Sequence, residues 1–296
     1  MVCGLLPGIA CPRPVLCVSD GHGFSRHAVG VDSLPISACL ISGAEAARIG
    51  RALESLRGLV SEVVVVLNEE VTDGTEEICL RYGARVHRLP WRGFRDQKNA
   101  VQDLASQPWI LQLDADEELS QGLRDEVRGF FDGDHQRFVG AMFPRKVWFL
   151  GRWITHGDWY PDRVMRLYRR DSGRWGGAEE HCRVVVDGPV RRLRGDLHHY
   201  TNPTIATYVG KFPYYADLYL KRQLESGARW SPVAAVVRSL WRFVRAYVFR
   251  RGFLDGYPGF FIAFSTAYAT LFRHTRLYEH RCPTLPPRPH AGGPPA

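Results

Sequence analysis

The stretch that decides the fold is Trp109-Ile110-Leu111-Gln112-Leu113-Asp114-Ala115-Asp116-Glu117-Glu118. Its first half is an almost continuous apolar run, which is typical of a strand buried on both faces of a sheet. The run ends abruptly in a cluster of carboxylates. In open parallel sheets, ligands bind beyond the carboxyl ends of the strands. The stretch therefore predicts a buried strand whose end carries a site for a charged ligand.

Asp114 and Asp116 are candidates for holding one divalent cation. Residues two apart in an extended chain project on the same side, and carboxylate oxygens are the ligands that hard cations prefer. A cation held by only two carboxylates keeps coordination positions for substrate phosphates. The structural alternative is that the acids after Ala115 only lead into the next helix, where the N-terminal dipole favours negative charge.

Strands alternate with helices on both sides of this stretch. Uninterrupted branched or apolar runs predict strands, apolar residues at helical spacing predict crossover helices, and turn formers followed by an acid predict a helix start. This alternation predicts an α/β fold of the doubly wound, mostly parallel, Rossmann-like type. The predicted strands are 34–41, 63–67 and 85–89, and the predicted helices are 49–60, one starting near 72–76, and 94–105. A β-hairpin with an Asp187-Gly188 turn is predicted over 182–193.

Composition and charge limit the class of protein. The chain has 296 residues, is 45% hydrophobic and carries a formal net charge of +8, so it can bury a large core and favours an acidic partner. Seven cysteines, never spaced as Cys-x-x-Cys, predict a reducing compartment without structural zinc. Nucleic acid is disfavoured as the partner because no reader motif occurs. Anionic lipid and phosphorylated substrates remain.

Four segments are predicted. Residues 1–33 lack periodicity and a signal-peptide pattern, so they are expected to be a disordered leader; 34–202 form the α/β domain, 203–282 a helical region, and 283–296 a disordered proline-rich tail.

The helical region has a basic stripe beside an apolar one. Arg238, Arg242 and Arg245 fall on one side of a helix that starts at Ser231-Pro232. Such a helix is typical of one lying on an anionic membrane surface, although a helix packed on its own domain with a solvated arginine face is the alternative. The uncharged run 256–272 barely reaches spanning length, so we favour a surface-dipping or core helix over a transmembrane span.

Several motifs together resemble a known family. Three of them resemble motifs of glycosyltransferase family 2: Thr72-Asp73-Gly74-Thr75, Trp91-x-Gly93-Phe94-x-x-Gln97-Lys98-Asn99 and Leu113-Asp114-Ala115-Asp116-Glu117. The branch they resemble most is that of bacterial lipopolysaccharide-core β-glucosyltransferases, and the resemblance covers roughly Pro35 to Tyr215. It implies a GT-A fold, a nucleotide-sugar donor and inversion at the anomeric carbon. Together with the basic stripe of the helical region, it leads us to expect a cytoplasmic enzyme that is peripheral at the inner membrane.

The resemblance implies a metal cofactor, Mg²⁺ or Mn²⁺. Asp114 and Asp116 would hold it, with His199 as a further ligand; a hydrogen-bonded structural histidine is the alternative for His199. Negative charge builds on the nucleoside diphosphate as the sugar departs, and a bridging cation stabilises that charge.

The donor side is implied to comprise Glu45, Asn68, Asp73, Lys98 and Asp114. UDP-glucose is the expected donor. Two positions depart from the family pattern: only the Glu of the usual Asn-Glu pair is present, at Glu45, and Asn68 stands where an aspartate is usual. Asparagine can still hydrogen-bond a uracil or ribose edge. A solvated helix-face lysine is the alternative for Lys98.

The acceptor side is implied to include Trp159, Tyr160 and Arg166, in a segment dense in aromatic and basic residues. The acceptor is expected to be a glycolipid or saccharide, with phosphate on it suited to the basic run.

A carboxylate must take the proton of the acceptor hydroxyl. Glu180 is the first choice and Glu179 the second; both could instead be a surface turn pair. The family has an acid after the histidine, where this chain has Cys182.

Three functions follow. The leading hypothesis is a metal-dependent inverting transferase that moves a hexose, with glucose expected, to a lipopolysaccharide-core or other glycolipid. One rival is sugar transfer to polyprenyl phosphate. The other is a catalytically decayed GT-A binding module, which Cys182 and Asn68 favour and the intact Asp114 and Asp116 oppose.

Overall fold

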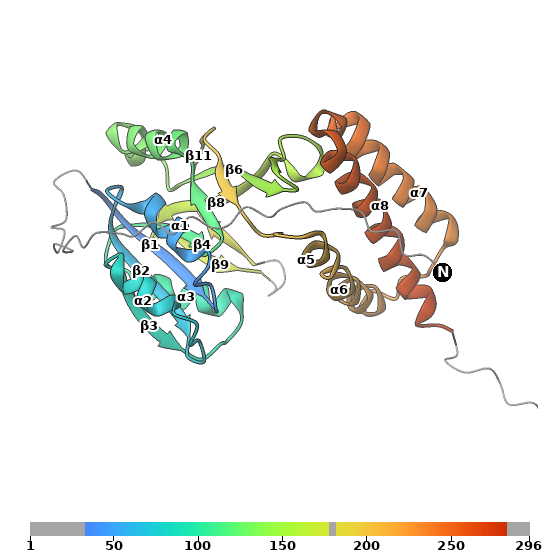
Figure 1. Cartoon of the computed structure of the whole chain (residues 1–296), viewed down its shortest axis with the longest axis horizontal. Helices are drawn as coiled ribbons and strands as arrows, with labels where there is room; N and C mark the ends of the chain where they lie inside the picture. Colours follow the sequence, from blue (N-terminus) through green and yellow to red (C-terminus); the bar gives the residue numbers. More distant parts are fainter. Residues whose placement is uncertain (1–32, 178–181, 283–296) are drawn as a thin grey trace, which may run out of the picture.

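A computed structural model describes residues 33–177 and 182–282 and shows an α/β body beside a group of helices (Figure 1). The predicted leader and tail lie outside the described residues, apart from Ser33. The elements are, in chain order, β1 (Leu34–Ser42), α1 (Ile49–Leu56), β2 (Val60–Asn68), α2 (Thr75–Arg81), β3 (Arg85–Leu89), α3 (Phe94–Asp103), β4 (Trp109–Asp114), β5 (Glu117–Leu119), α4 (Gln121–Asp132), η1 (Asp134–Gln136), β6 (Gly140–Phe149), β7 (Arg152–Trp153), η2 (Gly157–Trp159), β8 (Asp162–Arg169), β9 (Gly173–Gly176), β10 (Arg183–Val186), β11 (Val190–Arg192), β12 (Leu197–His199), α5 (Ile205–Val209), α6 (Phe212–Glu225), α7 (Pro232–Val244), η4 (Arg245–Phe249), η5 (Gly252–Asp255) and α8 (Gly256–Glu279).

The first half of the main sheet is parallel, in the order β3-β2-β1-β4. Leu40 of β1 pairs with Val65 of β2 on one side and with Leu113 of β4 on the other. The branched and apolar runs formed these strands because both faces of each are covered. The strand order reverses at β1, so the carboxyl ends of β1 and β4 flank the switch point where ligands bind in such sheets.

The second half of the sheet is mostly antiparallel and follows the order β4-β8-β6-β12-β5. β8 runs against both β4 and β6, and β12 runs against β5 with His199 opposite Glu117. The predicted α/β class with a Rossmann-like, doubly wound sheet is confirmed, and the antiparallel half is what extends it. The pairing of β12 with β5 carries His199 to the end of β4.

Side chains alternate between two cores along β1. Ala38 and Leu40 pack with α1 and α4, whereas Cys39 and Ile41 pack with α3 and the β9–β10 pair. The sheet is thus covered on both faces, and its carboxyl edge is left for the site.

The hairpin predicted over 182–193 is wrong. β10 pairs with β9 instead, and β11 pairs in parallel with β6. β10 has four residues and β11 three, and a two-stranded hairpin this short is marginally stable by itself, so each strand pairs with a different partner in the tertiary structure.

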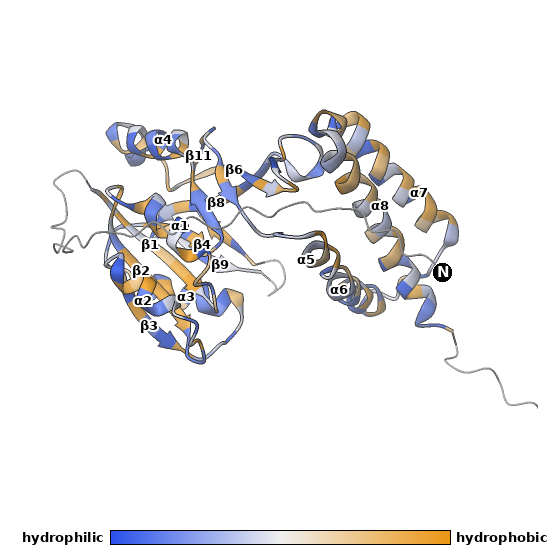
Figure 2. Ribbon diagram, viewed as in Figure 1, coloured by the Kyte–Doolittle hydropathy of each residue, from blue (hydrophilic) through white to orange (hydrophobic). Residues whose placement is uncertain are grey.

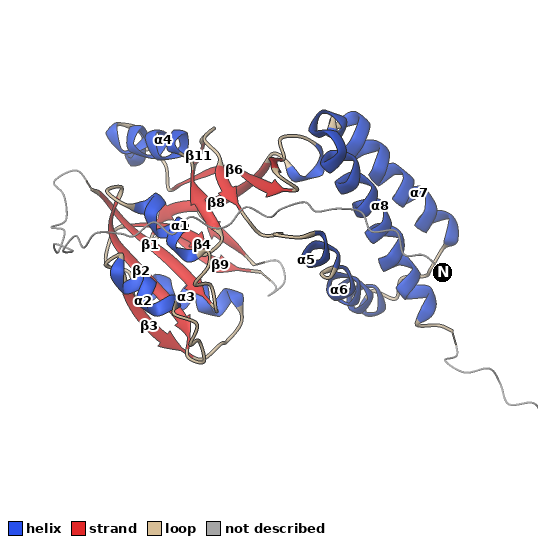
Figure 3. Ribbon diagram, in the orientation of Figure 1, coloured by secondary structure: helices blue, strands red, loops and turns tan. Residues whose placement is uncertain are grey.

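The C-terminal helices α5 to α8 stand beside the α/β body, as Figures 1 and 3 show. α6 and α7 both pack on α8. No helix within residues 33–177 or 182–282 combines the length and apolarity needed to cross a bilayer. The helical character predicted for this region is confirmed, and the exact segment boundaries stay a prediction.

Two buried aspartates join the helices to the segment between β7 and β8. Asp158 accepts hydrogen bonds from Arg245 at 2.8 Å. It also forms ion pairs with Arg242 at 2.9 Å and Arg250 at 3.5 Å. Asp255, which is 0% exposed, accepts from the backbone N–H groups of Thr155 at 3.0 Å and His156 at 2.8 Å.

We expect Asp255→Ala to lower the free energy of unfolding by about 3 kcal/mol, because two buried backbone donors lose a charged acceptor. Urea unfolding followed by circular dichroism measures this. Asp217→Ala, which removes an exposed partner of Arg276, is the control and should cost about 0.5 kcal/mol. Equal losses in both variants would contradict the prediction.

Candidate active site

The loops that follow β1 and β2 are tied together at the carboxyl edge of the sheet. Asp73 accepts hydrogen bonds from the Ala46 N–H at 3.0 Å and the Thr75 N–H at 3.1 Å. Thr75 in turn accepts one from the Glu45 N–H at 2.9 Å. The predicted donor residues Glu45 and Asp73 therefore lie on two neighbouring loops, and Asn68 ends β2 at the same edge.

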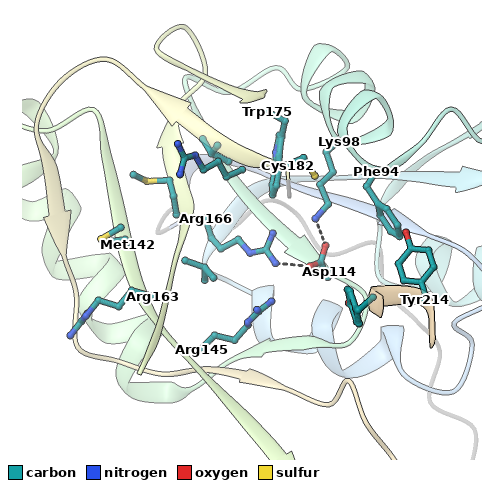
Figure 4. Close-up of a pocket in the computed structure, with 15 residues that line it drawn as sticks. Phe94, Lys98, Asp114, Met142, Arg145, Arg163, Arg166, Trp175, Cys182 and Tyr214 are labelled. Atoms are coloured by element: carbon teal, nitrogen blue, oxygen red, sulfur yellow. Dashed lines mark hydrogen bonds and ion pairs between the residues drawn. The ribbon is translucent and has the colours of Figure 1, made fainter. Parts of the chain in front are cut away.

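Asp114 lies between two cations at the end of β4. Its carboxylate contacts Lys98 Nζ of α3 at 2.7 Å and a guanidinium nitrogen of Arg166 of β8 at 2.5 Å (Figure 4). Lys98 and Arg166 are only 6% and 4% exposed. Burial alone raises the pKa of Asp114, but the charges of Arg166 and Lys98 outweigh it and hold that pKa far below its usual value. Asp114 is therefore ionised at neutral pH.

Trp175 lies against both cations. Lys98 Nζ is 4.3 Å and the Arg166 guanidinium carbon 5.7 Å from the centre of its ring. An aromatic face attracts a desolvated cation electrostatically. The ring from β9 thus helps to hold the two cations around Asp114.

Glu117 belongs to the same group, and the sequence analysis did not assign it. Its side chain is 0% exposed and contacts Arg166 at 2.7 Å and Arg145 at 3.4 Å. It also accepts the backbone N–H of Asp114 at 3.1 Å. The available signal was the pattern of β5, in which Glu117 shares the inward side with Leu119. An acid on a buried side needs a cation nearby.

Asp116 and His199 form a second group at this edge. His199 Nε2 lies 3.5 Å from an Asp116 carboxylate oxygen, and Arg48 lies 3.8 Å from the same atom. Burial raises the pKa of Asp116, but the hydrogen bond from His199 and the charges of His199 and Arg48 leave that pKa below its usual value. Nδ1 of His199 is buried without a hydrogen-bond partner within the described chain.

The Asp116–His199 pair suits a divalent cation. An ion with bonds of about 2.1 Å reaches two ligand atoms at this separation, and carboxylate with imidazole is a ligand set that Mn²⁺ accepts. No group of three or more His, Cys, Asp or Glu side chains converges for metal binding among the residues the structure describes. The protein residues therefore fit a cation whose remaining ligands are substrate oxygens and water.

A cavity of about 570 Å³ lies beside Asp114, and its lining includes Tyr214 (Figure 4) and Tyr215 of α6. The cavity is strongly basic: its lining includes Lys98, Arg145, Arg163, Arg166 and Arg183. Asp114 is the acid among the described lining residues. Such a cavity attracts anionic substrates.

The predicted acceptor residues are only partly brought together. Arg166 lines the cavity. Trp159 packs with Phe149 at 5.3 Å and Tyr208 at 5.1 Å between ring centres, beside the helices. Tyr160 donates a hydrogen bond to Asp196 at 2.9 Å, and burial together with this bond raises its pKa to about 12. The acceptor roles of Trp159 and Tyr160 stay predictions.

The predicted bases Glu179 and Glu180 lie outside the described residues. Cys182, just after them, lines the cavity. The choice between the two glutamates stays a prediction.

The chain has the GT-A fold. The parallel half of its sheet ends in paired aspartates, and the antiparallel half borders the cavity. Residues 37–194 match the family model described as Glycosyl transferase family 2. The chain belongs to that family and is a glycosyltransferase.

Two curated relatives illustrate the similarity. An uncharacterised glycosyltransferase of Rickettsia typhi is 30% identical over 254 residues, covering 82% of this chain and 87% of the relative. LpsC of Rhizobium meliloti, a lipopolysaccharide core biosynthesis glycosyltransferase, is 30% identical over 257 residues, covering 84% of this chain and 94% of LpsC.

Solved structures are more distant. S. aureus TarS 1-349 in complex with UDP-GlcNAc has 16% identity and a TM-score of 0.44, covering 82% of this chain and 83% of that one. Glucosyl-3-phosphoglycerate synthase of Mycobacterium tuberculosis, in complex with Mn²⁺, UDP and glucosyl-3-phosphoglycerate, has 16% identity and a TM-score of 0.38, covering 60% and 79%.

Proposed function

We propose that the chain transfers a hexose, with inversion, from a nucleoside-diphosphate sugar to a lipopolysaccharide-core or related glycolipid acceptor. The observation that carries the proposal is the charged edge of the sheet, where Asp114 with its two cations lines the basic cavity and Asp116, paired with His199, follows directly after the end of β4. The similarity to LpsC supports the class of acceptor. UDP-glucose is the proposed donor.

Asp116 and His199 would hold Mg²⁺ or Mn²⁺, with Asp114 as a further proposed ligand. When bound, the cation neutralises the charge on the departing diphosphate. A cation of the chain itself acts on the same charge. Lys98 is fixed by Asp114 and borders the cavity, so it attracts phosphate oxygens without reorganising.

The donor nucleoside is proposed to lie along the loops after β1 and β2. Asn68 would hydrogen-bond the base or ribose edge through its amide. Asp73 and Glu45 hold the two loops together by the backbone contacts to Ala46 and Thr75. Their role would be to keep the loops at one spacing around the nucleoside.

The acceptor hydroxyl is proposed to attack the anomeric carbon in line, opposite the departing diphosphate. Glu180, or Glu179 in its place, would take the hydroxyl proton as general base. Tyr160 and Trp159 are proposed to border the acceptor site, and Arg166 would attract an anionic group on the acceptor.

We further propose a peripheral position at the cytoplasmic face of the inner membrane. Large apolar side chains are exposed along α7 and α8, and Figure 2 colours much of these two helices as hydrophobic. An exposed apolar helical face beside basic residues binds the interface of an anionic bilayer. The residues of this apolar face include Val237, Leu240, Trp241, Tyr257, Phe260 and Phe264.

The test is a panel of nucleotide sugars assayed with Mg²⁺ or Mn²⁺ and with purified cell-envelope glycolipid as acceptor. We expect UDP-glucose to be consumed in a metal-dependent way and one hexose to appear on the glycolipid. Faster transfer to polyprenyl phosphate would favour that rival acceptor. No metal-dependent turnover of any donor would support a decayed binding module and overturn the proposal.

A further inference from the structure

A second group of basic side chains lies in the helical region, away from the cavity. It consists of Arg222 of α6, Arg238 and Arg242 of α7, and Arg273 of α8, and we call it the arginine cluster. None of the four lines the cavity. The three helices meet because α6 and α7 both pack on α8.

Arg273 lies against Tyr219 of α6. Its guanidinium carbon lies 5.0 Å from the centre of the Tyr219 ring, and the Tyr219 hydroxyl lies 3.2 Å from His274 Nδ1. Nε of Arg273 is buried and has no hydrogen-bond partner within the described chain. A buried donor left unpaired costs free energy, so its partner is expected to be a molecule outside the protein chain.

Arg238 and Arg242 are one turn apart on α7 and so lie on the same side of that helix. Arg242 contacts Asp158 at 2.9 Å, but Asp158 also binds Arg245 and Arg250. Within the described parts of the chain, neither Arg238 nor Arg273 has an ion pair with a carboxylate. The cluster therefore has more positive charge than the protein neutralises.

The electrostatics agree with this geometry. Burial lowers the pKa of Arg273; Tyr219 opposes this change, and the charges of Arg242, Arg222 and Arg238 add to it. Like charges held together in a partly buried site repel each other and favour a bound anion. Arginine guanidinium groups match the oxygens of phosphate with paired hydrogen bonds.

The apolar face of α7 and α8 adjoins the cluster. Trp241, which is 56% exposed, is one helical turn from Arg238. A ligand that joins a phosphate to acyl chains could therefore contact both surfaces at once. We propose that the arginine cluster binds the phosphate of an anionic phospholipid headgroup while the apolar face contacts the acyl region. This inference rests on the proposed membrane position, and not on the proposed transfer reaction.

The test is calorimetric titration of the full chain with dihexanoyl phosphatidic acid below its micelle concentration. We expect Arg238→Gln/Arg273→Gln to weaken binding about tenfold or more, because two charge-assisted contacts to the phosphate are lost. The matched control Arg81→Gln/Arg137→Gln removes the same charge from exposed positions in the α/β body and should bind as the wild type does. Equal binding by both double variants and the wild type would overturn the proposal.

Two further titrations identify the source of the phosphate. Dihexanoyl phosphatidylcholine, whose headgroup has no net charge, should bind more weakly than phosphatidic acid. Inorganic phosphate should also bind more weakly, because it lacks the acyl chains. Inorganic phosphate binding as tightly as the lipid would replace the lipid site by a free-phosphate site and overturn the proposal.

Thermal unfolding and hydrolysis without acceptor show whether the cluster variants keep their fold and their donor site. Removing repulsive charge should leave the unfolding temperature unchanged or higher, and Arg238→Gln alone, at an exposed position, is measured if the double variant does not fold. Hydrolysis of nucleotide sugar in the absence of acceptor should match wild type in the cluster variants. Cluster variants that lose lipid binding but keep hydrolysis would show a defect in the lipid site alone. This outcome differs from a failure of the proposed transfer, which would appear as lost hydrolysis.

Discussion

Asp116→Ala is expected to lower kcat/KM for metal-dependent turnover of the nucleotide sugar about 10³-fold. Asp116 is the carboxylate nearest His199, at 3.5 Å, so the variant leaves the imidazole as the remaining protein ligand of this pair. The charge on the departing diphosphate would then be poorly neutralised. Initial rates with UDP-glucose and Mn²⁺, at several metal concentrations, measure the effect.

Asp132→Ala is the matched control, because Asp132 is exposed at the end of α4. It should keep wild-type turnover. Asp116→Ala should also keep the wild-type fold, since Asp116 is at the sheet edge and is held by long contacts to His199 and Arg48. A folded Asp116→Ala protein with wild-type turnover would show that the cation is bound elsewhere or is not needed.

Arg166→Met is expected to lower the free energy of unfolding by about 3–5 kcal/mol. Arg166 neutralises both Asp114, at 2.5 Å, and the fully buried Glu117, at 2.7 Å. Without it, the ion pair that Glu117 keeps within the described residues is the longer one to Arg145, at 3.4 Å. A buried carboxylate without a close counter-charge is costly, and this cost exceeds the apolar gain from the methionine.

Urea unfolding of Arg166→Met is compared with that of Arg169→Met on the same strand. Arg169 pairs at 3.4 Å with Asp171, whose side chain is 69% exposed, so its replacement should change stability by about 0.5 kcal/mol or less. A loss in Arg166→Met as small as in Arg169→Met would contradict the prediction.

The sequence predicted the parallel half of the fold because its signals are local. The apolar run before Asp114 and the branched run 63–67 each identify a buried strand without any knowledge of its partners. The β10 and β11 pairing could not be predicted in the same way. Those strands are short, and their partners, β9 and β6, were decided by tertiary contacts rather than by the Asp187-Gly188 turn.

The residues of the candidate site also divide into those that local signals predict and those that depend on tertiary contacts. Asp114 and Asp116 were predicted from their position at a strand end, and Lys98 from its motif. Glu117 and Arg145 were missed because their roles come from strands that are brought together across the sheet. Periodicity shows that a residue points inward, but it does not show which distant cation it will meet. The Asp158 and Asp255 contacts to the helical region were missed for this reason too.

The most direct test of the account is calorimetric titration of UDP into the wild-type chain with Mn²⁺ and, separately, with EDTA. The account predicts binding with Mn²⁺, at least tenfold weaker binding with EDTA (about 1.4 kcal/mol or more), and loss of the Mn²⁺ dependence in Asp116→Ala. UDP binding that is the same with and without Mn²⁺, or unchanged in Asp116→Ala, would contradict it.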